Sequence, residues 1–581
     1  MSLLVVARAG GSASGMPGTA VERALAEART QGFSGPNTAA WPGGAAWLFP
    51  TPGQVRGSGA WVEEGPLFAA SVGAFDWQGL TGTEALRRLL LLPGPIEALP
   101  FQQIAGSFVL LLGRADGVWL VGDALGLGKA YEADGTGVIS TSLLVCRAAM
   151  THAGVNRLRA QEYVLLGATH GRDTPIDGLR AVDPTAAVDL RSGRVVPVHA
   201  PAMLLSGPVP ASREDAVTQV CAELASGFRQ LKRNWGGRLG MALSGGFDSR
   251  LLLSALEHVQ EQPRLYVYGR AGDEDVTVAR AVAKRLGRTI EVFDKSVLER
   301  DLPPLTSERL RQHQRFFDGL PLDGIFNRGT DQQTRLLQVA GDCLNLNGGG
   351  GEILRNFFYL PSRRFTAAQV VAAFYSGWFD EVFANADDRL AFVGALQDKI
   401  LESLGRDSGS AAARAQLLSR TEVELVYTVF RLRWWMGRNN AVAARYGSFM
   451  TPIVTPRLVK LAAAIPIAWK DGGRLEADVI TRLAPEVAAG PSAYGFSFDQ
   501  GSSWRHRLNT AMTLYRPVSV RHYSLKVQRL LGRVQPVAAP QEWCHALGEA
   551  PRSDWLNPGA LNRLDQMNRL LTLQALARWG A

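Results

Sequence analysis

The sequence predicts a mixed α/β protein in two parts, residues 1–200 and residues 211–581. In the first part, short apolar runs alternate with Gly, Pro and Asp turns, which is typical of antiparallel strands and hairpins. In the second part, strand-like runs alternate with helix-like runs, which indicates a parallel sheet that binds ligands at the carboxyl ends of its strands. From about Ala367 onward the pattern is largely helical. We therefore expect an α+β domain followed by an α/β domain with a helical extension.

The bulk composition indicates a folded chain. Hydrophobic residues make up 46% and charged residues 20% of 581 residues, which is ordinary for globular domains. The four cysteines form no CxxC pair, so a disulfide framework, a zinc site and an iron–sulfur cluster are not expected. No signal or membrane-spanning segment is evident, so we expect a cytoplasmic protein with no membrane association. The net charge of +9 favours anionic partners such as nucleotide phosphates or an acidic peptide, and no nucleic-acid-binding signature accompanies it.

The first part contains several expected strands. The Asp-Gly pair at 116–117 indicates a hairpin between two of them. The Pro-containing stretch 197–210 is expected to be a linker. The expected strands cover residues 46–49, 107–112, 118–121 and 138–141.

In the second part, apolar spacing distinguishes strands from helices. Val276, Ala279, Ala283 and Leu286 recur on one face of a predicted helix over 275–286. A second helix is expected over 250–256. The expected buried strands cover residues 238–243, 264–268 and 289–293.

The strongest chemical signal is Leu-Ser-Gly-Gly-Phe-Asp-Ser at 243–249. It lies between a predicted strand and a predicted helix, where backbone N–H groups and the helix dipole favour a phosphate. Ser244 and Ser249 can add hydroxyl donors, whereas Asp248 would repel phosphate unless it held a magnesium ion. No Lys follows the glycines, so this is not a Walker P-loop. The alternative interpretation is a glycine turn with a helix N-cap.

The motif Ser-Gly-Gly-Phe-Asp-Ser resembles the PP-loop of N-type ATP pyrophosphatases, which cleave ATP to AMP and pyrophosphate. The strand, acidic turn and helix over 266–287, and the Gly-rich stretch Leu-Asn-Gly-Gly-Gly-Gly-Glu at 346–352, resemble asparagine synthetase-like enzymes. The resemblance implies ATP and Mg²⁺ as ligands, and it implies that Asp248 and Glu352 are catalytic and hold the metal. The alternative for the second stretch is a flexible surface loop. The residues that it implies for ATP binding are Leu243, Ser244, Gly245, Gly246, Asp248, Ser249, Val267, Tyr268, Gly348 and Gly349.

The first part also resembles that family. Residues 105–109, 121–126 and Tyr131 are similar to the glutamine amidotransferase domain that supplies ammonia from glutamine. That activity needs an N-terminal cysteine nucleophile, and this chain has Ser2 with no cysteine nearby. We therefore expect residues 1–200 to be a degenerate domain with an Ntn-hydrolase-like αββα sandwich. The same resemblance implies an adenine-nucleotide α-hydrolase-like parallel sheet in residues 211–581.

Family members without the cysteine include β-lactam synthetases and lasso-peptide cyclases, which join a substrate's amine to its own adenylated carboxylate. By resemblance to that branch, we expect an AMP-forming carbon–nitrogen ligase acting on a peptide or small-molecule carboxylate. Macrolactam formation in a lasso-type peptide is the leading subtype, and it implies a leader-binding protein and a leader peptidase as partners. The alternatives are an asparagine synthetase using free ammonia, a PP-loop enzyme acting on tRNA, and an ATP-binding relative without catalysis.

Two positions depart from the family pattern. Asn347 replaces the Ser before the second Gly run, so Gly349 stands where the family has a base or a substrate contact. Ala493, in Ala-Tyr-Gly-Phe, replaces a Lys that stabilises developing charge. Arg355, Lys470 and Arg474 are candidate replacement cations, and the alternative for each is a solvated or salt-bridged surface charge.

A basic stretch lies near the end of the second part. It contains no acidic residue and has a helix-like pattern. Most such stretches are solvated faces, and a minority dock an acidic peptide. Its basic residues are Arg516, Arg521, Lys526, Arg529 and Arg533.

Overall fold

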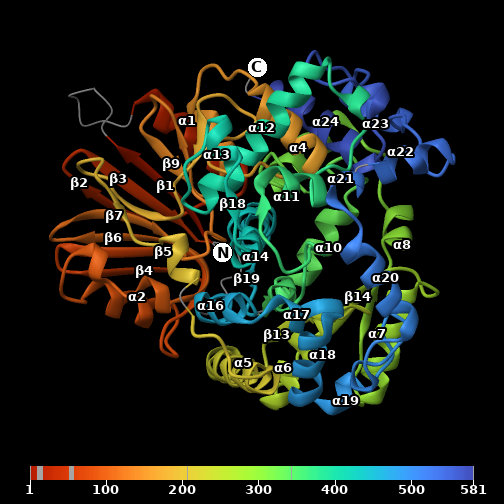
Figure 1. Ribbon diagram of the computed structural model, residues 1–581. Coiled ribbons are helices and arrows are strands. Elements are labelled where there is room, and N and C mark those ends of the chain that lie inside the picture. Colours follow the sequence, from red (N-terminus) through yellow and green to blue (C-terminus); the bar gives the residue numbers. More distant parts are fainter. Residues whose placement is uncertain are drawn as a thin grey trace.

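The computed structural model describes residues 2–8, 18–50, 58–205, 207–322, 324–341, 343–521 and 523–579. Figure 1 shows the N-terminal strands, red to orange, stacked beside a larger part in which helices surround a separate sheet. The predicted mixture of antiparallel sheets in the first part and a parallel sheet with helices in the second is confirmed.

The first part contains two six-stranded sheets, and every strand pair in them is antiparallel. The predicted hairpin is present, because Arg114 pairs with Gly117 at its end. In spatial order, the first sheet consists of β10 (Leu179–Ala181), β8 (Tyr131–Ala133), β9 (Val138–Ser140), β1 (Leu3–Arg8), β3 (Gly44–Phe49) and β2 (Asn37–Trp41). The second consists of β12 (Val195–Pro197), β11 (Ala186–Asp189), β7 (Gly117–Gly122), β6 (Ala105–Arg114), β5 (Leu67–Asp76) and β4 (Ser58–Glu64).

The alternation of side chains along β1 shows how the layers are built. Leu4 and Val6 pack between the two sheets against residues such as Leu111 of β6. Leu3 and Val5 point to the opposite face, as the two-residue period of a strand requires, and belong to the core that contains α1 (Thr19–Thr30) and α3 (Leu143–Ala149). The outer face of the second sheet is covered by α2 (Gly82–Leu90). The layer order is therefore helix, sheet, sheet, helix.

The second part is organised around a five-stranded parallel sheet of order β15-β14-β13-β16-β19. The chain runs outward from β13 to β15 and then crosses back to place β16 on the other side of β13. In an open parallel sheet, the point where the strand order reverses is where ligands bind. The bounds are β13 (Leu239–Ala242), β14 (Arg264–Tyr268), β15 (Glu291–Phe293), β16 (Leu344–Leu346) and β19 (Ser448–Met450), with the helices α5 (Arg213–Trp235), α6 (Phe247–His258) and α7 (Glu274–Arg285).

The remainder is mostly helical, as the sequence predicts, with one short strand pair, β17 (Phe365–Thr366) and β18 (Leu417–Leu418). In the described part of the chain, every helix is too short or too polar to span a bilayer. The helices up to residue 443 are α4 (Arg157–Leu166), α8 (Lys295–Arg300), α9 (Ser307–Phe316), α10 (Thr330–Gln338), α11 (Ala367–Phe374), α12 (Ala386–Ser403), α13 (Ala411–Arg414), α14 (Arg420–Val426), the π-helix η6 (Tyr427–Met436) and α15 (Gly437–Ala443). Those that follow are α16 (Pro456–Ala464), α17 (Ile467–Lys470), α18 (Arg474–Leu483), α19 (Pro485–Ala488), α20 (Trp504–Tyr515), α21 (Val518–Arg521), α22 (Tyr523–Leu530), α23 (Gln541–Leu547) and α24 (Leu564–Ala577).

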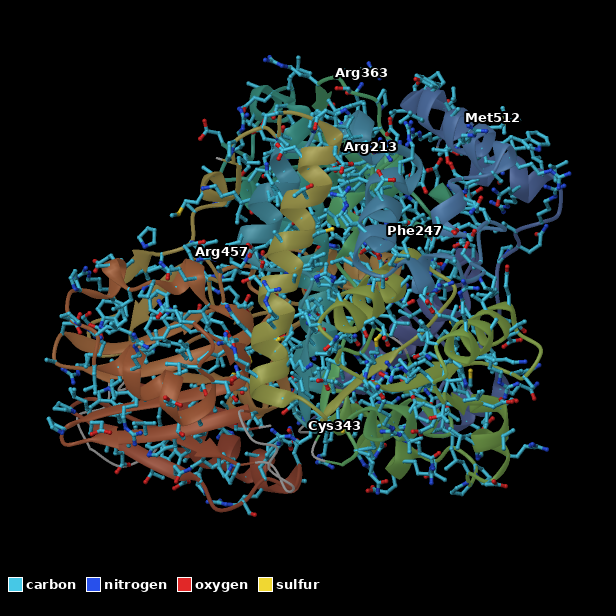
Figure 2. The ribbon with its side chains drawn as sticks, turned by 90° about the horizontal axis from the view of Figure 1, so that it is seen from below. Arg213, Phe247, Cys343, Arg363, Arg457 and Met512 are labelled. Carbon is cyan, nitrogen blue, oxygen red and sulfur yellow. The ribbon has the colours of Figure 1, made fainter. Side chains whose placement is uncertain are left out.

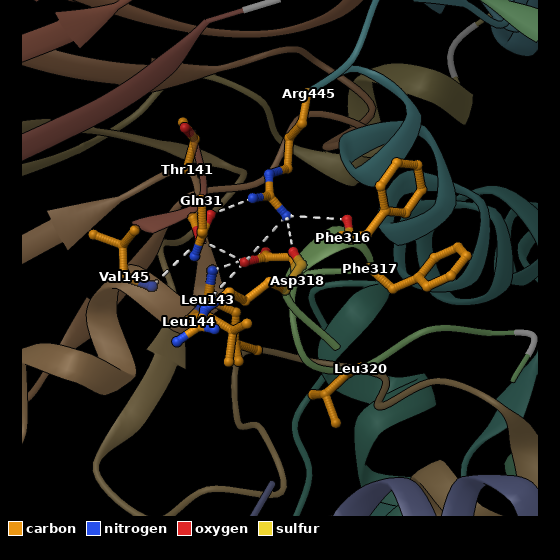
Figure 3. A network of polar contacts seen from close by, with 12 residues as sticks. Gln31, Thr141, Leu143, Leu144, Val145, Phe316, Phe317, Asp318, Leu320 and Arg445 are labelled. Atoms are coloured by element: carbon orange, nitrogen blue, oxygen red, sulfur yellow. Dashed lines mark hydrogen bonds and ion pairs between the residues drawn. The ribbon is translucent and has the colours of Figure 1, made fainter. Parts of the chain in front are cut away.

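A buried carboxylate joins the two parts. Asp318, only 2% exposed, accepts hydrogen bonds from the backbone N–H groups of Leu143 and Leu144 and from the hydroxyl of Ser142, at the N-terminus of α3 (Figure 3). The guanidinium groups of Arg438 and Arg445 lie 3.3 and 3.6 Å from the same carboxylate. A residue of the second part therefore caps a helix of the first.

The C-terminal helix makes a second connection. Arg569 of α24 donates to the backbone carbonyl of Val164 in α4 over 2.9 Å. Figure 1 places α24 close to α4 at the top of the molecule. The last helix therefore packs against an element that belongs to the early chain.

Candidate functional site

The loop 244–249 leaves the end of β13 and enters α6, as predicted. The hydroxyl of Ser249 accepts from the backbone N–H of Ser244 over 3.1 Å and lies 3.0 Å from the hydroxyl of Ser244, which closes the loop. The backbone N–H of Gly245 donates to the carboxylate of Asp275 over 2.9 Å. Among the described residues, no side chain caps the N-terminus of α6. The loop therefore already binds one anionic oxygen through a backbone N–H, which is the interaction that a phosphate needs.

The second Gly-rich loop follows β16, the neighbour of β13, and touches the first. A Cβ on Gly348 would lie 3.2 Å from the backbone oxygen of Asp248. A Cβ on Gly351 would lie 2.5 Å from Oδ1 of Asp248 and 2.7 Å from Oε1 of Glu476. Only glycine permits this approach, so the glycines allow the two loops to pack together.

Three carboxylates converge on one guanidinium at this junction. Nη2 of Arg355 lies 2.5 Å from Oδ1 of Asp248 and 4.0 Å from Oε1 of Glu352, and Nε lies 2.8 Å from Oε2 of Glu476. Glu352 also accepts hydrogen bonds from the hydroxyl of Tyr427 over 2.7 Å and from the backbone N–H of Gly350 over 2.9 Å. The predicted pair, Asp248 and Glu352, is therefore brought together.

The junction is acidic overall, because three carboxylates face one cation. Burial raises the pKa of Asp248 to about 7, against the lowering effect of Arg355. Burial also raises the pKa of Glu476, which is fully buried, well above its usual value. Burial lowers the pKa of Arg355, but the surrounding carboxylates outweigh it and hold that pKa well above its usual range. The site therefore has an excess of acid that an additional cation would relieve.

Whether these residues fit magnesium follows from their number and exposure. The side chains of Asp248 and Glu352 are 27% and 22% exposed, so both reach solvent. In the described ranges, no three His, Cys, Asp or Glu side chains are placed to hold a metal ion by themselves. Magnesium commonly binds through one or two carboxylates together with substrate phosphates and water. The two carboxylates fit a magnesium ion that arrives with a nucleotide, and do not form an all-protein metal site.

The loop that contains Ala493 lies directly over the first glycine loop. The backbone N–H of Ala493 donates to the carbonyl of Gly245 over 3.1 Å. The rings of Tyr494 and Phe247 lie 4.9 Å apart. A side chain at position 493 therefore lies beside the glycine loop, where the resemblance expects a Lys, and this chain places a methyl group there.

A cavity of about 300 Å³ opens beside the second Gly-rich loop, at the carboxyl ends of the strands. Tyr268 and Gly348, both predicted to bind ATP, line it. The cations Lys295 and Arg335 also line it, and the ammonium of Lys295 lies 5.9 Å from the ring centre of Tyr268. Asp331 also lines the cavity and forms an ion pair with Lys295, so the cavity can accommodate a polar group beside side chains of both charges.

The other residues predicted to bind ATP do not line this cavity. Leu243 and Val267 are buried in the core, so only their backbone groups could meet a ligand. Gly349 donates its N–H to the side chain of Asn347 over 3.0 Å. That side chain donates to Asn440, which in turn donates to Thr451 over 2.8 Å and to Ser107 of β6 over 3.4 Å. A chain of hydrogen bonds thus links the second Gly-rich loop to the first part of the molecule.

The interpretation of Lys470 as a solvated or salt-bridged surface charge is correct in the ion pair and wrong in the surface position. Lys470 is 1% exposed and its ammonium lies 3.5 Å from Glu424, because α17 ends inside the helical part. Burial lowers its pKa, against the effect of Glu424. Arg474 is exposed and donates to the backbone carbonyl of Asp471 over 3.1 Å. Arg355 is therefore the candidate cation that contacts Asp248.

Ser2 lies directly before β1 and is 2% exposed. Its hydroxyl donates to the backbone carbonyl of Ser71 over 3.3 Å. A Cβ on Gly59 would lie 2.2 Å from that hydroxyl oxygen. The Ser2 hydroxyl is therefore enclosed between strands.

A larger cavity, of about 780 Å³, lies elsewhere, between α1, α9 and α24. Arginines line much of it, including Arg23 and Arg147, but both guanidinium groups bind backbone carbonyls. None of the residues predicted for ATP binding lines it. Its size therefore does not make it the stronger candidate.

Sequence reasoning missed three residues of the site. Glu476 lies in a helix far along the chain and follows no recognisable motif, so no sequence signal marks it. Tyr427 begins the π-helix, a rare element that often occurs at functional sites. Asp275 stands out in the sequence only as part of an acidic turn, although its position near the start of a helix could have suggested contact with the neighbouring loop.

Comparison with known proteins gives no assignment. No protein-family model matches the chain, and no curated protein matches its sequence. The geometry of the site is therefore the basis for any functional conclusion.

Proposed function

We propose that this chain is an ATP-dependent ligase that forms an amide bond with release of AMP and pyrophosphate, in the manner of the asparagine synthetase family. The observation that carries the proposal is the contact between two Gly-rich loops at the carboxyl ends of adjacent parallel strands, with Asp248 and Glu352 around one guanidinium. The parallel sheet would then be of the adenine-nucleotide α-hydrolase type. The helix–sheet–sheet–helix layers of the first part support an Ntn-hydrolase-like αββα sandwich.

In this proposal, the phosphates of ATP lie over residues 244–249, and the base and ribose occupy the 300 Å³ cavity beside Tyr268 and Gly348. A phosphate at the N–H of Gly245 would displace the carboxylate of Asp275. Asp248 and Glu352 would hold a magnesium ion, which would neutralise phosphate charge. Arg355, which lies beside both carboxylates and keeps Glu476 as a partner, would stabilise negative charge near the α-phosphate. The protein mainly positions and neutralises the reactants.

The reaction would begin with attack of a substrate carboxylate on the α-phosphorus, which gives an acyl-adenylate and pyrophosphate. An amine then attacks the acyl carbon, forms the amide and releases AMP. The enclosed Ser2 supports a degenerate amidotransferase domain, so the amine would belong to the substrate. Lasso-type macrolactam formation is the leading subtype, with a leader-binding protein and a leader peptidase as partners.

A second candidate is an ATP-binding protein without transfer activity. The observation that favours it is Ala493, which places a methyl group beside Gly245 where the family has a charge-stabilising Lys. In that case Asp248 and Glu352 would still support nucleotide binding, but no acyl group would be transferred.

The test measures MgATP binding by calorimetry, followed by carboxylate-dependent exchange of labelled pyrophosphate into ATP. Pools of short peptides that carry Asp or Glu are compared with aspartate plus ammonium. A ligase binds MgATP and exchanges pyrophosphate only with its substrate, and exchange with aspartate and ammonium indicates an asparagine synthetase. Binding without exchange supports the second candidate. Absence of MgATP binding contradicts both.

Two variants connect the result to the site. Asp248→Asn combined with Glu352→Gln is expected to weaken MgATP binding at least about tenfold, because each lost charge contact is worth about 1–3 kcal/mol. Glu308→Gln, an exposed acid on α9, is the matched control and should bind as the parent does.

A further inference from the structure

The segment 504–533 is unusual in charge. It contains six Arg, one Lys and no Asp or Glu, in a chain with 53 acidic residues. Part of this charge is used internally, because Arg521 is buried and donates to the backbone carbonyls of Phe358 and Tyr359. Lys526 and Arg529 pair with Asp380 and Glu381 over 2.9 and 3.0 Å. These contacts fasten the segment to the helical part.

Four further cations of the segment are exposed, and three of them lie in α20 or directly after it. Arg505, Arg507 and Arg516 are exposed, and within the described ranges none of them forms an ion pair with an acid. Arg505 lies 5.5 Å from the ring centre of Trp504, and Arg516 donates to the hydroxyl of Ser524 over 3.0 Å. Their positive charge is therefore not neutralised within the described protein.

The same segment exposes large apolar side chains in a regular pattern. Trp504, Leu508, Met512 and Tyr515 recur at helical spacing along one face of α20, and they are 63%, 50%, 58% and 75% exposed. Figure 2 shows Met512 at the periphery, far from the N-terminal sheets. Single exposed apolar residues are ordinary, but a row of them with cations beside it marks an interaction surface.

The end of the segment continues this character. Val527, Leu530 and Leu531, in and just after α22, are 51%, 86% and 62% exposed. We define the α20–α22 face as the exposed apolar side chains of α20 and α22 together with the three exposed arginines in or directly after α20. A partner that fits it must offer apolar groups and negative charge side by side.

Helix α20 also contacts the loop at the candidate nucleotide site, on the side opposite its exposed apolar row. His506 of α20 lies 5.6 Å from the ring of Tyr494 and 5.1 Å from that of Phe496. These rings belong to the loop whose Ala493 binds the backbone of Gly245. A molecule on the α20–α22 face is therefore separated from the glycine loop by the thickness of α20, about 10 Å.

We infer that the α20–α22 face docks an acidic amphipathic peptide, in which carboxylate side chains alternate with apolar ones. This inference rests on the proposed function for the role of the peptide, which would be the ligase's substrate. Carboxylates would pair with Arg505, Arg507 and Arg516, while apolar side chains cover the row on α20. A peptide is favoured over an anionic bilayer because a peptide chain can extend around α20 to a site about one helix diameter away, whereas a bilayer surface cannot.

The binding test uses the full chain without ATP. A fluorescent peptide of glutamates alternating with leucines and phenylalanines is titrated, and anisotropy is measured at low and at physiological ionic strength. Binding is expected, with weaker affinity at the higher ionic strength because exposed charges are screened. A peptide with Lys in place of Glu should not bind.

Variants assign the binding to the face. Arg505→Glu with Arg516→Glu is expected to weaken peptide binding at least about tenfold, and Leu508→Ser with Met512→Ser about fivefold or more. The matched controls are Arg29→Glu with Arg191→Glu and Leu390→Ser with Leu417→Ser, which change exposed residues elsewhere and should bind within about twofold of the parent. Thermal unfolding verifies that each variant is folded.

The remaining outcomes overturn the inference. If the peptide does not bind, or if both α20 variants bind it like the parent, the face is not a peptide site. Binding to phosphatidylglycerol vesicles without peptide binding would indicate a membrane surface, and a change in sedimentation of the α20 variants alone would indicate self-association. MgATP binding is measured separately on the same proteins. If the parent binds the peptide but not MgATP, the proposed function is refuted and the peptide site is not.

Discussion

Gly351→Ala probes the junction of the two loops with a single methyl group. Gly351 has a negative φ, so alanine can adopt its backbone conformation and any effect comes from the new side chain. That methyl would meet Oδ1 of Asp248 at 2.5 Å and Oε1 of Glu476 at 2.7 Å. The substitution therefore acts on the carboxylates and not on the fold.

The expected magnitude follows from these distances. To restore an ordinary 3.4 Å contact, Asp248 would have to retreat by about 0.9 Å and Glu476 by about 0.7 Å. Glu476 is fully buried and cannot move into solvent, so Asp248 would move more and leave its position relative to Glu352. Overpacking of this kind costs about 1–3 kcal/mol. If that cost falls on the bound state, affinity for MgATP decreases about 5- to 150-fold.

The assay is calorimetric titration of MgATP, with thermal unfolding as the measure of stability. Gly227→Ala is the matched control, because Gly227 lies within α5 and no described atom outside its own helix backbone lies within 4 Å of its Cβ position. Alanine there should stabilise the helix by up to about 1 kcal/mol and leave nucleotide binding unchanged.

Unchanged MgATP affinity in Gly351→Ala, in a protein that unfolds like the parent, would refute the reasoning. It would mean that the carboxylates at this junction do not take part in nucleotide binding. Loss of stability without loss of affinity in the remaining folded protein would lead to the same conclusion, since the glycine would then serve packing alone.

Three further outcomes follow from the buried polar groups. Asp318→Asn is expected to lower the free energy of unfolding by about 3–5 kcal/mol, because it leaves two buried guanidinium groups without their carboxylate; urea denaturation measures it, and a loss below about 1 kcal/mol would contradict the assigned role. Burial lowers the pKa of Lys129 to about 7, from the ordinary lysine value of 10.5. Between these two pH values the folded state binds fewer protons than the unfolded state, so Lys129 makes the free energy of unfolding increase with pH. From pH 7 to 9, the free energy of unfolding of Lys129→Met should therefore increase less steeply than that of the parent, with slopes that differ by up to about 1.4 kcal/mol per pH unit. Parallel plots of unfolding free energy against pH would refute the lowered pKa of Lys129. Asn440→Ala should weaken MgATP binding by about 1–2 kcal/mol, because Asn347 loses the acceptor that holds its side chain beside the second Gly-rich loop. Asn440→Asp keeps that acceptor and should lose less affinity. Equal MgATP affinities for the parent and Asn440→Ala would show that these hydrogen bonds do not affect nucleotide binding.

Much of the fold could be predicted because its signals are local. The β6–β7 hairpin follows from an Asp-Gly turn between apolar runs, and α7 from the spacing of apolar residues along one helix face. The strands β16 and β19 were not predicted from the sequence. The Pro-rich stretch expected to be a linker includes the end of β12 at Pro197 and the short helix η3 (Pro201–Leu205). Short apolar or Pro-containing runs acquire a structure from their neighbours, which sequence patterns do not report.

The candidate site was predictable only as far as its motifs reach. Asp248 and Glu352 stand in glycine-rich stretches whose composition indicates close backbone approach, and the structure places them together. Arg355 was one of three candidate cations in the sequence, and only the tertiary contacts single it out. Glu476 completes the cluster through a tertiary contact, and it lies in no pattern that distinguishes it from other charged helix residues. The burial of Lys470 was missed for the same reason, because a Lys near a Gly-rich turn is ordinarily exposed.

The attachment of α24 to α4 has a consequence for how the molecule is made. During synthesis, α4 leaves the ribosome roughly 400 residues before the helix that covers it, at a few residues per second or more. Until then its outer surface stays available to chaperones and proteases. A nascent chain stalled before residue 564 should therefore be cleaved near α4 in limited proteolysis, whereas the released protein should be protected there.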